Sequence, residues 1–370
     1  MMRIFATIVG CFLIVTVIID SFQTVILARR PSRRWRISRA FYQSSWKVYS
    51  AVGRRIKSDR RRETYLGTFG ALSLVSLFVL WACGLIFAFA LIQWAAGSQL
   101  LEGSSSFGTD IYFSAATFFT LGSPEPGTVW VKALIVGEVG LGYSFLALVI
   151  GYLPVFYTSF SNRELRISLL DSRAGSPPHA GELLLRQGAN PDKLERQLAD
   201  WEEWAAELLE SHLSYPVLAY FRSQHSNQSW LSTLTTIVDA SAVVMVASKD
   251  DLKRQAEMSF AIGQHAMKDL TAVFRKNPHP PHTDRLPSEE FNRMRLRLAD
   301  GPIPLQFDDD SEAALRLLRD SYEPYAHVLS EHFMMPLPRW IPAGLVHHNW
   351  QLEKAPRTMH DRHVHESRST

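Results

Sequence analysis

The sequence predicts an all-α membrane protein with three transmembrane helices, a re-entrant helix and loop between the second and third of them, and a helical cytoplasmic domain after them. Three long apolar runs carry this prediction: residues 4–28 contain only one charge, Asp20, residues 64–101 contain none, and residues 133–162 contain only Glu138. A helix needs about 20 apolar residues to cross a bilayer. The second half differs in composition, because all 13 histidines lie beyond residue 178.

These shifts in composition predict the domain boundaries. The N-terminal run is too long for a signal peptide and ends without a small-residue cleavage site, so we expect a retained helix. The two cysteines, Cys11 and Cys83, lie inside apolar runs, which predicts neither a structural disulfide nor a thiolate metal site. The expected order is an N-terminal transmembrane helix (1–30), a basic cytoplasmic loop (31–66), a pore domain (67–160), a cytoplasmic helical domain (161–345) and a disordered tail (346–370).

Charge predicts the orientation in the membrane. Residues 29–62 hold eleven Arg and two Lys against a single acid, whereas residues 96–131 hold three acids and no Lys or Arg. A run this basic is also typical of segments that bind nucleic acid or anionic lipid. A short basic loop between spans stays in the cytoplasm, however, and its contact with lipid headgroups follows from that position. We therefore expect a cell-membrane protein with an outer N-terminus, a cytoplasmic C-terminus and no nucleic-acid partner.

The segment of residues 97–128 is too short for two further spans. It offers helix N-cap candidates, then about two or three turns of apolar residues, and then a Gly- and Pro-rich stretch that ends any helix. Irregular backbone at membrane depth is tolerated where it lines a water-filled cavity, and rings of carbonyl groups replace the hydration shell of a cation in filters. The cap candidates are Ser106, Thr109 and Asp110, and the helix-ending residues are Gly122, Pro124, Pro126 and Gly127.

The stretch "DIYFSAATFFTLGSPEP" (110–126) resembles the pore helix and selectivity filter of the potassium-channel superfamily, of the bacterial two-helix pore type, here with an extra N-terminal span and a cytoplasmic helical domain. The resemblance implies a homo-oligomer, most simply a tetramer, because one chain supplies one pore loop. It also implies a permeant K⁺ or other monovalent cation and no cofactor. The residues on matching positions are Tyr112, Phe113, Ser114, Thr117, Thr120 and Gly122, with Leu121 in place of Val and Glu125 as the acid after the filter.

Two positions depart from the pattern of that family. Ser123 stands where the filter has Tyr, and Pro124 stands where it has its second Gly. Proline fixes φ near −65° and has no N–H, so the upper filter is not expected to form as in the family. Two functions follow: a cation channel that discriminates weakly between K⁺ and Na⁺ and is regulated by its cytoplasmic domain, or a non-conducting membrane receptor or scaffold with a degenerate channel fold. No phosphate-binding loop, nucleophile elbow or CxxC is present, so we do not expect an enzyme.

Two ionisable residues, Asp20 and Glu138, lie inside the apolar runs. An ionised side chain at mid-bilayer costs about 2.5–3.5 kcal/mol, so such residues face protein or water. Glu138 is then an acidic ring in the outer pore, a brace behind the filter, or a hydrated interfacial residue. Asp20 is expected to pair with Arg29, Arg30 or the basic loop, or to act in an ion relay.

Gly142 lies where the resemblance implies a hinge or close-packing glycine in the pore-lining span.

The second half reads as helical. Residues 229–248 are apolar enough for a fourth span, but Asp239, four Ser and three Thr favour a buried core helix. Residues 277–287 are rich in proline and predict a linker. His327 and His332 are five apart, which does not place two ligands on one helical face, and no HExxH occurs, so no metal site is predicted.

Overall fold

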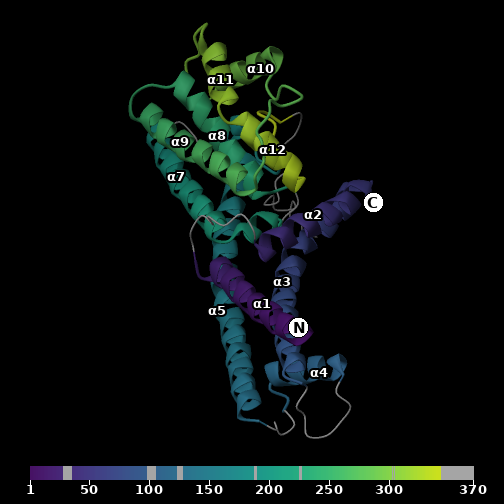
Figure 1. Cartoon of the computed structure of the whole chain (residues 1–370). Coiled ribbons are helices and arrows are strands. Elements are labelled where there is room, and N and C mark those ends of the chain that lie inside the picture. Colours follow the sequence, from purple (N-terminus) through teal and green to yellow (C-terminus); the bar gives the residue numbers. More distant parts are fainter. Residues whose placement is uncertain are drawn as a thin grey trace, which may run out of the picture. The chain divides into compact units, whose positions relative to one another are not determined.

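In the part of the chain that the structure, a computed structural model, describes, all regular secondary structure is helical and no strand occurs (Figure 1). This confirms the all-α prediction for those residues. The chain divides into two compact units. The first unit holds residues 1–162 and 209–222, and the second holds residues 163–208 and 223–370. The described residues are 1–27, 36–97, 106–122, 128–186, 190–224, 227–301, 303 and 305–342.

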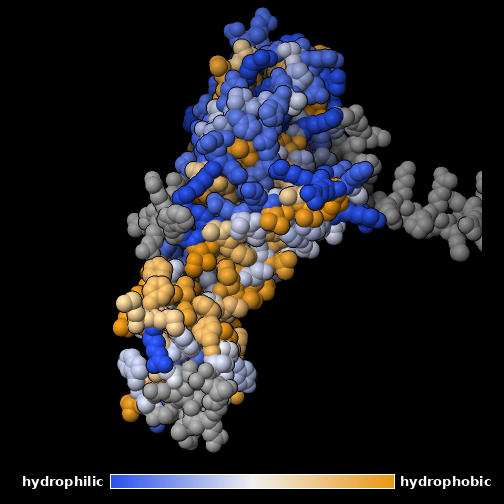
Figure 2. All heavy atoms as spheres, turned by 45° about the vertical axis from the view of Figure 1, so that its right-hand side comes forward, coloured by the Kyte–Doolittle hydropathy of each residue, from blue (hydrophilic) through white to orange (hydrophobic). Residues whose placement is uncertain are grey.

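Among the described residues, four helices are long and apolar enough to cross a membrane, which indicates a membrane protein. Three of them, α1 (Met2–Val25), α3 (Asp59–Ala95) and α5 (Val129–Ala174), coincide with the predicted spans. The fourth, α8 (Trp230–Ala247), differs from them because 89% of its 18-residue apolar stretch is buried inside the protein. Apolar surface gathers on the first unit, whereas the surface of the second unit is mostly hydrophilic (Figure 2).

Helices α1 and α3 pack along each other in the first unit. A Cβ atom on Gly10 would lie 2.7 Å from the carbonyl oxygen of Ala88, so this glycine permits the close approach that membrane helices use. Near the end of α1 the buried carboxylate of Asp20 accepts hydrogen bonds from the backbone N–H of Ser38 at 2.9 Å and from Trp81 Nε1 at 2.9 Å. It also lies 3.5 Å from Arg36 Nε. The carboxylate therefore joins α1, α3 and the basic segment, and the predicted pairing with that segment is made by Arg36. Arg29 and Arg30 lie outside the described residues.

The segment predicted as a basic loop (31–66) contains a helix instead, α2 (Ile37–Arg55), and the start of α3. Charge dominates its composition, but aromatic residues recur at helical spacing and face α3. The ring of Trp46 meets that of Phe69 edge-on with centroids 4.8 Å apart, and Tyr49 stacks on Tyr65 at 4.1 Å. The segment is therefore an amphipathic helix, and three of its four basic side chains are exposed: Lys47, Arg54 and Arg55.

Residues 209–222, from the C-terminal half of the chain, belong to the first unit. The observed division therefore differs from the single domain predicted over 161–345. The 3-10 helix η1 (Pro216–Tyr220) packs on α3, and the ring of Tyr220 lies 5.1 Å from that of Trp46. A Cβ atom on Gly70 would lie 2.5 Å from the ring of Phe221. Arg222 then pairs with Glu63 at 3.0 Å. Aromatic residues anchor this segment to α2 and α3.

The second unit is built around α8. Asp239 of α8 is fully buried, receives a hydrogen bond from Tyr322 Oη, and lies 2.6 Å from Arg285 Nη2. Protein groups thus neutralise the one charge of α8, so we interpret α8 as a core helix, in line with its burial. The helices around it are α6 (Ala180–Arg186), α7 (Pro191–Ser214), α9 (Asp250–Val273), α10 (Ser288–Ala299), α11 (Ser311–Asp320) and α12 (Glu323–Phe333).

Candidate functional site

A short helix, α4 (Phe107–Phe118), lies between α3 and α5 in the sequence and packs against α3 (Figure 1). Of the predicted cap residues, Ser106 is the N-cap: its hydroxyl oxygen accepts a hydrogen bond from the Thr109 backbone N–H at 3.2 Å. Asp110 lies in the first turn, where a carboxylate interacts favourably with the helix dipole. The structure therefore selects Ser106 from the three cap candidates that the sequence offered.

Glu138 of α5 fixes α4 in place. Its side chain is buried, Gln93 Nε2 of α3 donates a hydrogen bond to Oε2 at 3.0 Å, and the Ser114 hydroxyl of α4 donates one to Oε1. Ser114 Oγ also lies 2.8 Å from the carbonyl oxygen of Ile86 in α3. The carboxyl group thus links three helices, which is the geometry of the brace among the three roles considered for it.

Gly142, one helical turn after Glu138, lets α5 approach the end of α4. A Cβ atom at this position would lie only 2.4 Å from the carbonyl oxygen of Phe118. Residues four apart lie on the same face of a helix, so Glu138 and Gly142 hold α4 from one side. Of the two roles that the resemblance implies for Gly142, close packing is the one that this contact favours.

The C-terminal end of α4 is a hydrogen-bonded turn and is not frayed. The Thr120 N–H donates to the Thr117 carbonyl at 3.1 Å, and the Leu121 N–H donates to the Ala116 carbonyl at 2.8 Å. This pair of bonds is a Schellman motif with Thr120 in the left-handed position at φ 57°. A β-branched residue is disfavoured there by roughly 1–2 kcal/mol. Gly122 follows at φ 105°, a value that glycine adopts without a steric penalty.

The structure therefore brings part of the predicted filter together. Thr117 is buried inside the turn, and its Oγ1 has no hydrogen-bond partner among the described residues. Thr120, Leu121 and Gly122 are exposed at the end of α4. Ser123, Pro124 and Glu125 lie outside the described residues.

Helix α5 carries two opposite stripes. Buried residues occupy one face, which packs on the rest of the unit. Small residues recur at alternating spacings of three and four on the other face and are exposed in the single chain. At 100° per residue the two stripes lie roughly 150–200° apart around the helix. The spacing of these small residues is visible in the sequence: Gly137, Gly140, Ser144, Ala147, Gly151, Pro154 and Thr158.

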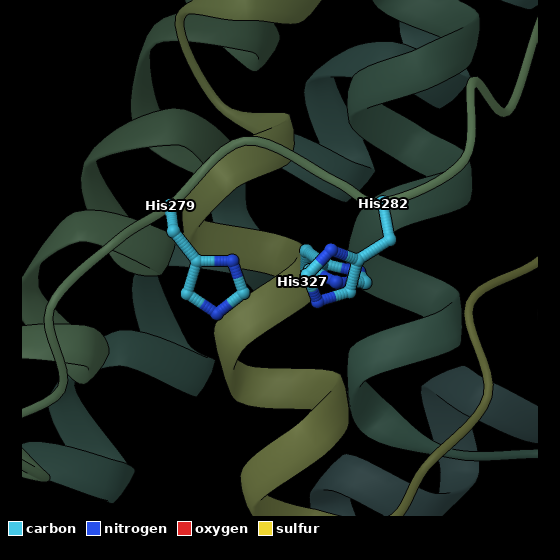
Figure 3. A group of neighbouring side chains, drawn as sticks. All are labelled: His279, His282 and His327. Carbon is cyan, nitrogen blue, oxygen red and sulfur yellow. The ribbon is translucent and has the colours of Figure 1, made fainter.

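A second group of candidate ligand side chains lies in the second unit, where no metal site was predicted. His279 and His282 come from the segment between α9 and α10, and His327 comes from α12 (Figure 3). One ring nitrogen of each lies within 4.8 Å of the others. The prediction rested on the spacing of His327 and His332, which lie on the same helix. A signal that could have found the cluster is the H-P-P-H spacing of residues 279–282.

The helices and their burial indicate a helical membrane protein with a short helix held between two long apolar helices. No family model, no curated protein and no solved structure matches the chain.

Proposed function

We propose that this chain forms an oligomeric channel for K⁺ or other monovalent cations, regulated by its second unit. The observation that carries the proposal is the brace of Glu138, Ser114 and Gln93, which fixes a 12-residue helix between two long apolar helices. The C-terminal end of a helix carries a partial negative charge, which favours a cation beside it. Thr117, Thr120, Leu121 and Gly122 lie at that end of α4, and the proposed filter continues through Ser123 to Glu125.

An ion path requires several copies, because one chain supplies one such loop, and a tetramer is the simplest ring. The face of α5 opposite the brace supports this. A Cβ atom on Gly137, Gly140 or Gly151 would meet nothing within 4 Å, so this face is open in the single chain. Small residues in a membrane helix permit close packing with a neighbouring helix and leave room along a pore. In the proposed assembly this face of α5 lines the ion path or meets the next subunit.

The route for regulation is the aromatic contact on the later part of α5. The ring of Phe156 lies 5.0 Å from that of Phe221 and 6.4 Å from that of Tyr215. Tyr215 follows α7, whose first residues belong to the second unit. A change in the second unit that moves residues 215–222 would therefore pull directly on α5, the helix that we propose lines the pore.

We assign the orientation from charge. The exposed basic residues of α2 and the flanking basic sequence support a cytoplasmic position for this segment, with contact to lipid headgroups. The N-terminus then lies outside and the second unit lies in the cytoplasm. We propose no enzymatic activity and no nucleic-acid partner.

The test is reconstitution of the full chain into planar bilayers with K⁺ on one side and Na⁺ on the other. Because proline at position 124 removes an N–H and restricts φ, we expect current with a reversal potential near zero. A matched pair of variants connects the current to the loop. Gly122→Val places a β-branched residue at φ 105° and should abolish the current, whereas Gly108→Ala, at the other end of α4, should retain it.

A reversal potential near the K⁺ value would contradict the expected weak selectivity. Absence of current from chains that crosslink as tetramers would contradict the channel. It would favour the second candidate, a non-conducting receptor or scaffold with a degenerate channel fold, for which Pro124 is the supporting observation. A monomer or dimer on crosslinking would count against a four-fold pore.

A further inference from the structure

We propose that the second unit carries a divalent transition-metal site, best suited to Zn²⁺, formed by the imidazoles of His279, His282 and His327 and the carboxylate of Glu331. The site is independent of the proposed channel activity. It unites two segments far apart in the sequence, the proline-rich stretch before α10 and the helix α12 (Figure 3).

The ligand atoms already converge. Nε2 of His279 lies 3.1 Å from Glu331 Oε2, Nε2 of His327 lies 3.2 Å from Glu331 Oε1, and Nε2 of His282 lies 3.8 Å from the same Oε1. Zinc bonds of 2.0–2.1 Å at tetrahedral angles require ligand atoms about 3.3 Å apart. His279 Nε2 and His327 Nε2 each lie within a few tenths of an ångström of that spacing from one oxygen of Glu331, Oε2 and Oε1 respectively, and the exposed ring of His282 has room to move closer.

The ring orientations also favour a metal. Nδ1 of His279 lies 3.3 Å from the carbonyl oxygen of Pro280, the backbone contact that commonly fixes a zinc-bound histidine with Nε2 as the ligand atom. Nε2 of His327 is buried and forms no hydrogen bond of good geometry among the described residues, although it faces Glu331. Coordination would satisfy this buried nitrogen.

The two segments are held before any metal arrives. Arg285, three residues after His282, pairs with Asp239 of α8 and, at 3.0 Å, with Glu323 at the start of α12. Arg319 of α11 pairs with both Asp284 and Glu323. These ion pairs tie the proline-rich stretch to the helix that carries His327 and Glu331. His327 and Glu331 are four residues apart and therefore share one face of α12.

The ligand set selects the class of metal. Imidazole nitrogens suit Zn²⁺, Ni²⁺ and Cu²⁺, whereas Mg²⁺ and Ca²⁺ prefer oxygen ligands. Three imidazoles and one carboxylate complete the four-coordinate shell that zinc adopts in structural sites. The alternative is a set of surface His–Glu ion pairs with no metal, which would contribute little to stability.

The experiment uses the full chain without an affinity tag, in detergent, stripped of metal with a chelator and titrated with Zn²⁺ against a chromophoric competitor. The sequence holds five further histidines after residue 342, so the titration is made in a background that removes them as ligands. Their substitutions are His347→Gln, His348→Gln, His360→Gln, His363→Gln and His365→Gln.

The variants separate ligand loss from unfolding. His282→Ala removes a ligand that is 79% exposed, so the fold should survive, and Glu331→Gln removes the carboxylate charge. The matched control is His265→Ala on α9, which is also exposed, at 59%, and whose ring pairs with Asp269 outside the cluster. Circular dichroism checks that each variant keeps its helix content.

We expect one Zn²⁺ per chain in the background protein, an X-ray absorption spectrum with nitrogen and oxygen neighbours near 2.0 Å, and a raised unfolding temperature that Mg²⁺ does not reproduce. His282→Ala should weaken zinc affinity by more than about tenfold, the smaller effect known for outer-shell partners of zinc ligands. His265→Ala should leave it unchanged. No zinc binding in the background protein, or equal affinity in His282→Ala and the control, would overturn the proposal.

Discussion

The hydroxyl of Ser114 on α4 donates a hydrogen bond to the buried carboxyl group of Glu138 on α5, and the same oxygen lies 2.8 Å from the Ile86 carbonyl of α3. A hydroxyl has one proton and cannot donate fully to two oxygens. The single Ser114 proton is therefore shared between the Glu138 and Ile86 oxygens. A group at position 138 that donates to the Ser114 oxygen would free this proton for Ile86.

We expect Glu138→Gln to retain the fold, since an amide can donate to Ser114 and still accept from Gln93. Glu138→Leu should destabilise the protein by about 1–3 kcal/mol, because it leaves the buried Gln93 Nε2 without its partner, whereas the Ser114 hydroxyl keeps the Ile86 carbonyl. Thermal unfolding in detergent compares the two variants. Equal unfolding temperatures for Glu138→Leu and the wild type would show that the brace contributes nothing.

Gly142→Ala should destabilise the first unit by about 1–3 kcal/mol, because its Cβ atom would lie 2.4 Å from the Phe118 carbonyl oxygen and force α4 and α5 apart. Gly108→Ala in α4 is the control, since its Cβ atom would lie 3.7 Å from Ser106 Oγ, an ordinary van der Waals distance. There the gain in helix propensity should dominate, and stability should stay equal or rise by up to about 1 kcal/mol. The measurement is thermal unfolding of both variants in monodisperse detergent. The reverse order of stabilities would contradict the packing described for Gly142.

Arg285→Met should lower the free energy of unfolding by about 3–5 kcal/mol, because it leaves the buried Asp239 and Glu323 without their shared cation. Burial lowers the pKa of Arg285, but Asp239, Tyr322 and Glu323 outweigh it and raise the pKa above its usual value. Arg254→Met, at a site that is 71% exposed, should change stability by less than about 0.5 kcal/mol. Chemical denaturation followed by tryptophan fluorescence measures both. A small effect of Arg285→Met would argue against α8 as a core helix neutralised by this pair.

We expect the second unit to be less stable in mild acid than at neutral pH because of the buried ring of His179. Burial lowers its pKa below 6.5, so the folded protein holds the ring neutral while the unfolded chain takes up a proton. The contribution is fully present above pH 6.5 and is lost as the pH falls below it, at up to about 1.4 kcal/mol per pH unit. Unfolding midpoints between pH 7.5 and 5.5 should therefore fall more steeply for the wild type than for His179→Gln. Parallel slopes would show that His179 does not titrate differently in the folded and unfolded states.

The sequence by itself determined the long apolar helices, the three candidate caps for the start of α4 and the burial of α8. Each depends on neighbours along the chain: an uncharged run, a serine three residues before an N–H, or polar residues within an apolar run. The same reasoning failed for α2, because counting basic residues concealed aromatic residues at helical spacing. Sequence reasoning also left three possible roles for Glu138, because a carboxyl group in an apolar run looks the same in the sequence whichever role it has.

Only the tertiary structure decided which groups those residues meet. Gln93 and Ser114 reach Glu138 from two other helices, and the Phe118 carbonyl explains why position 142 is a glycine. His279 and His327 converge only because Arg285 ties the proline-rich stretch to α8 and α12. The physical reason is the same in each case: periodicity reports which side of a helix is buried, but the partner on that side comes from a distant part of the chain.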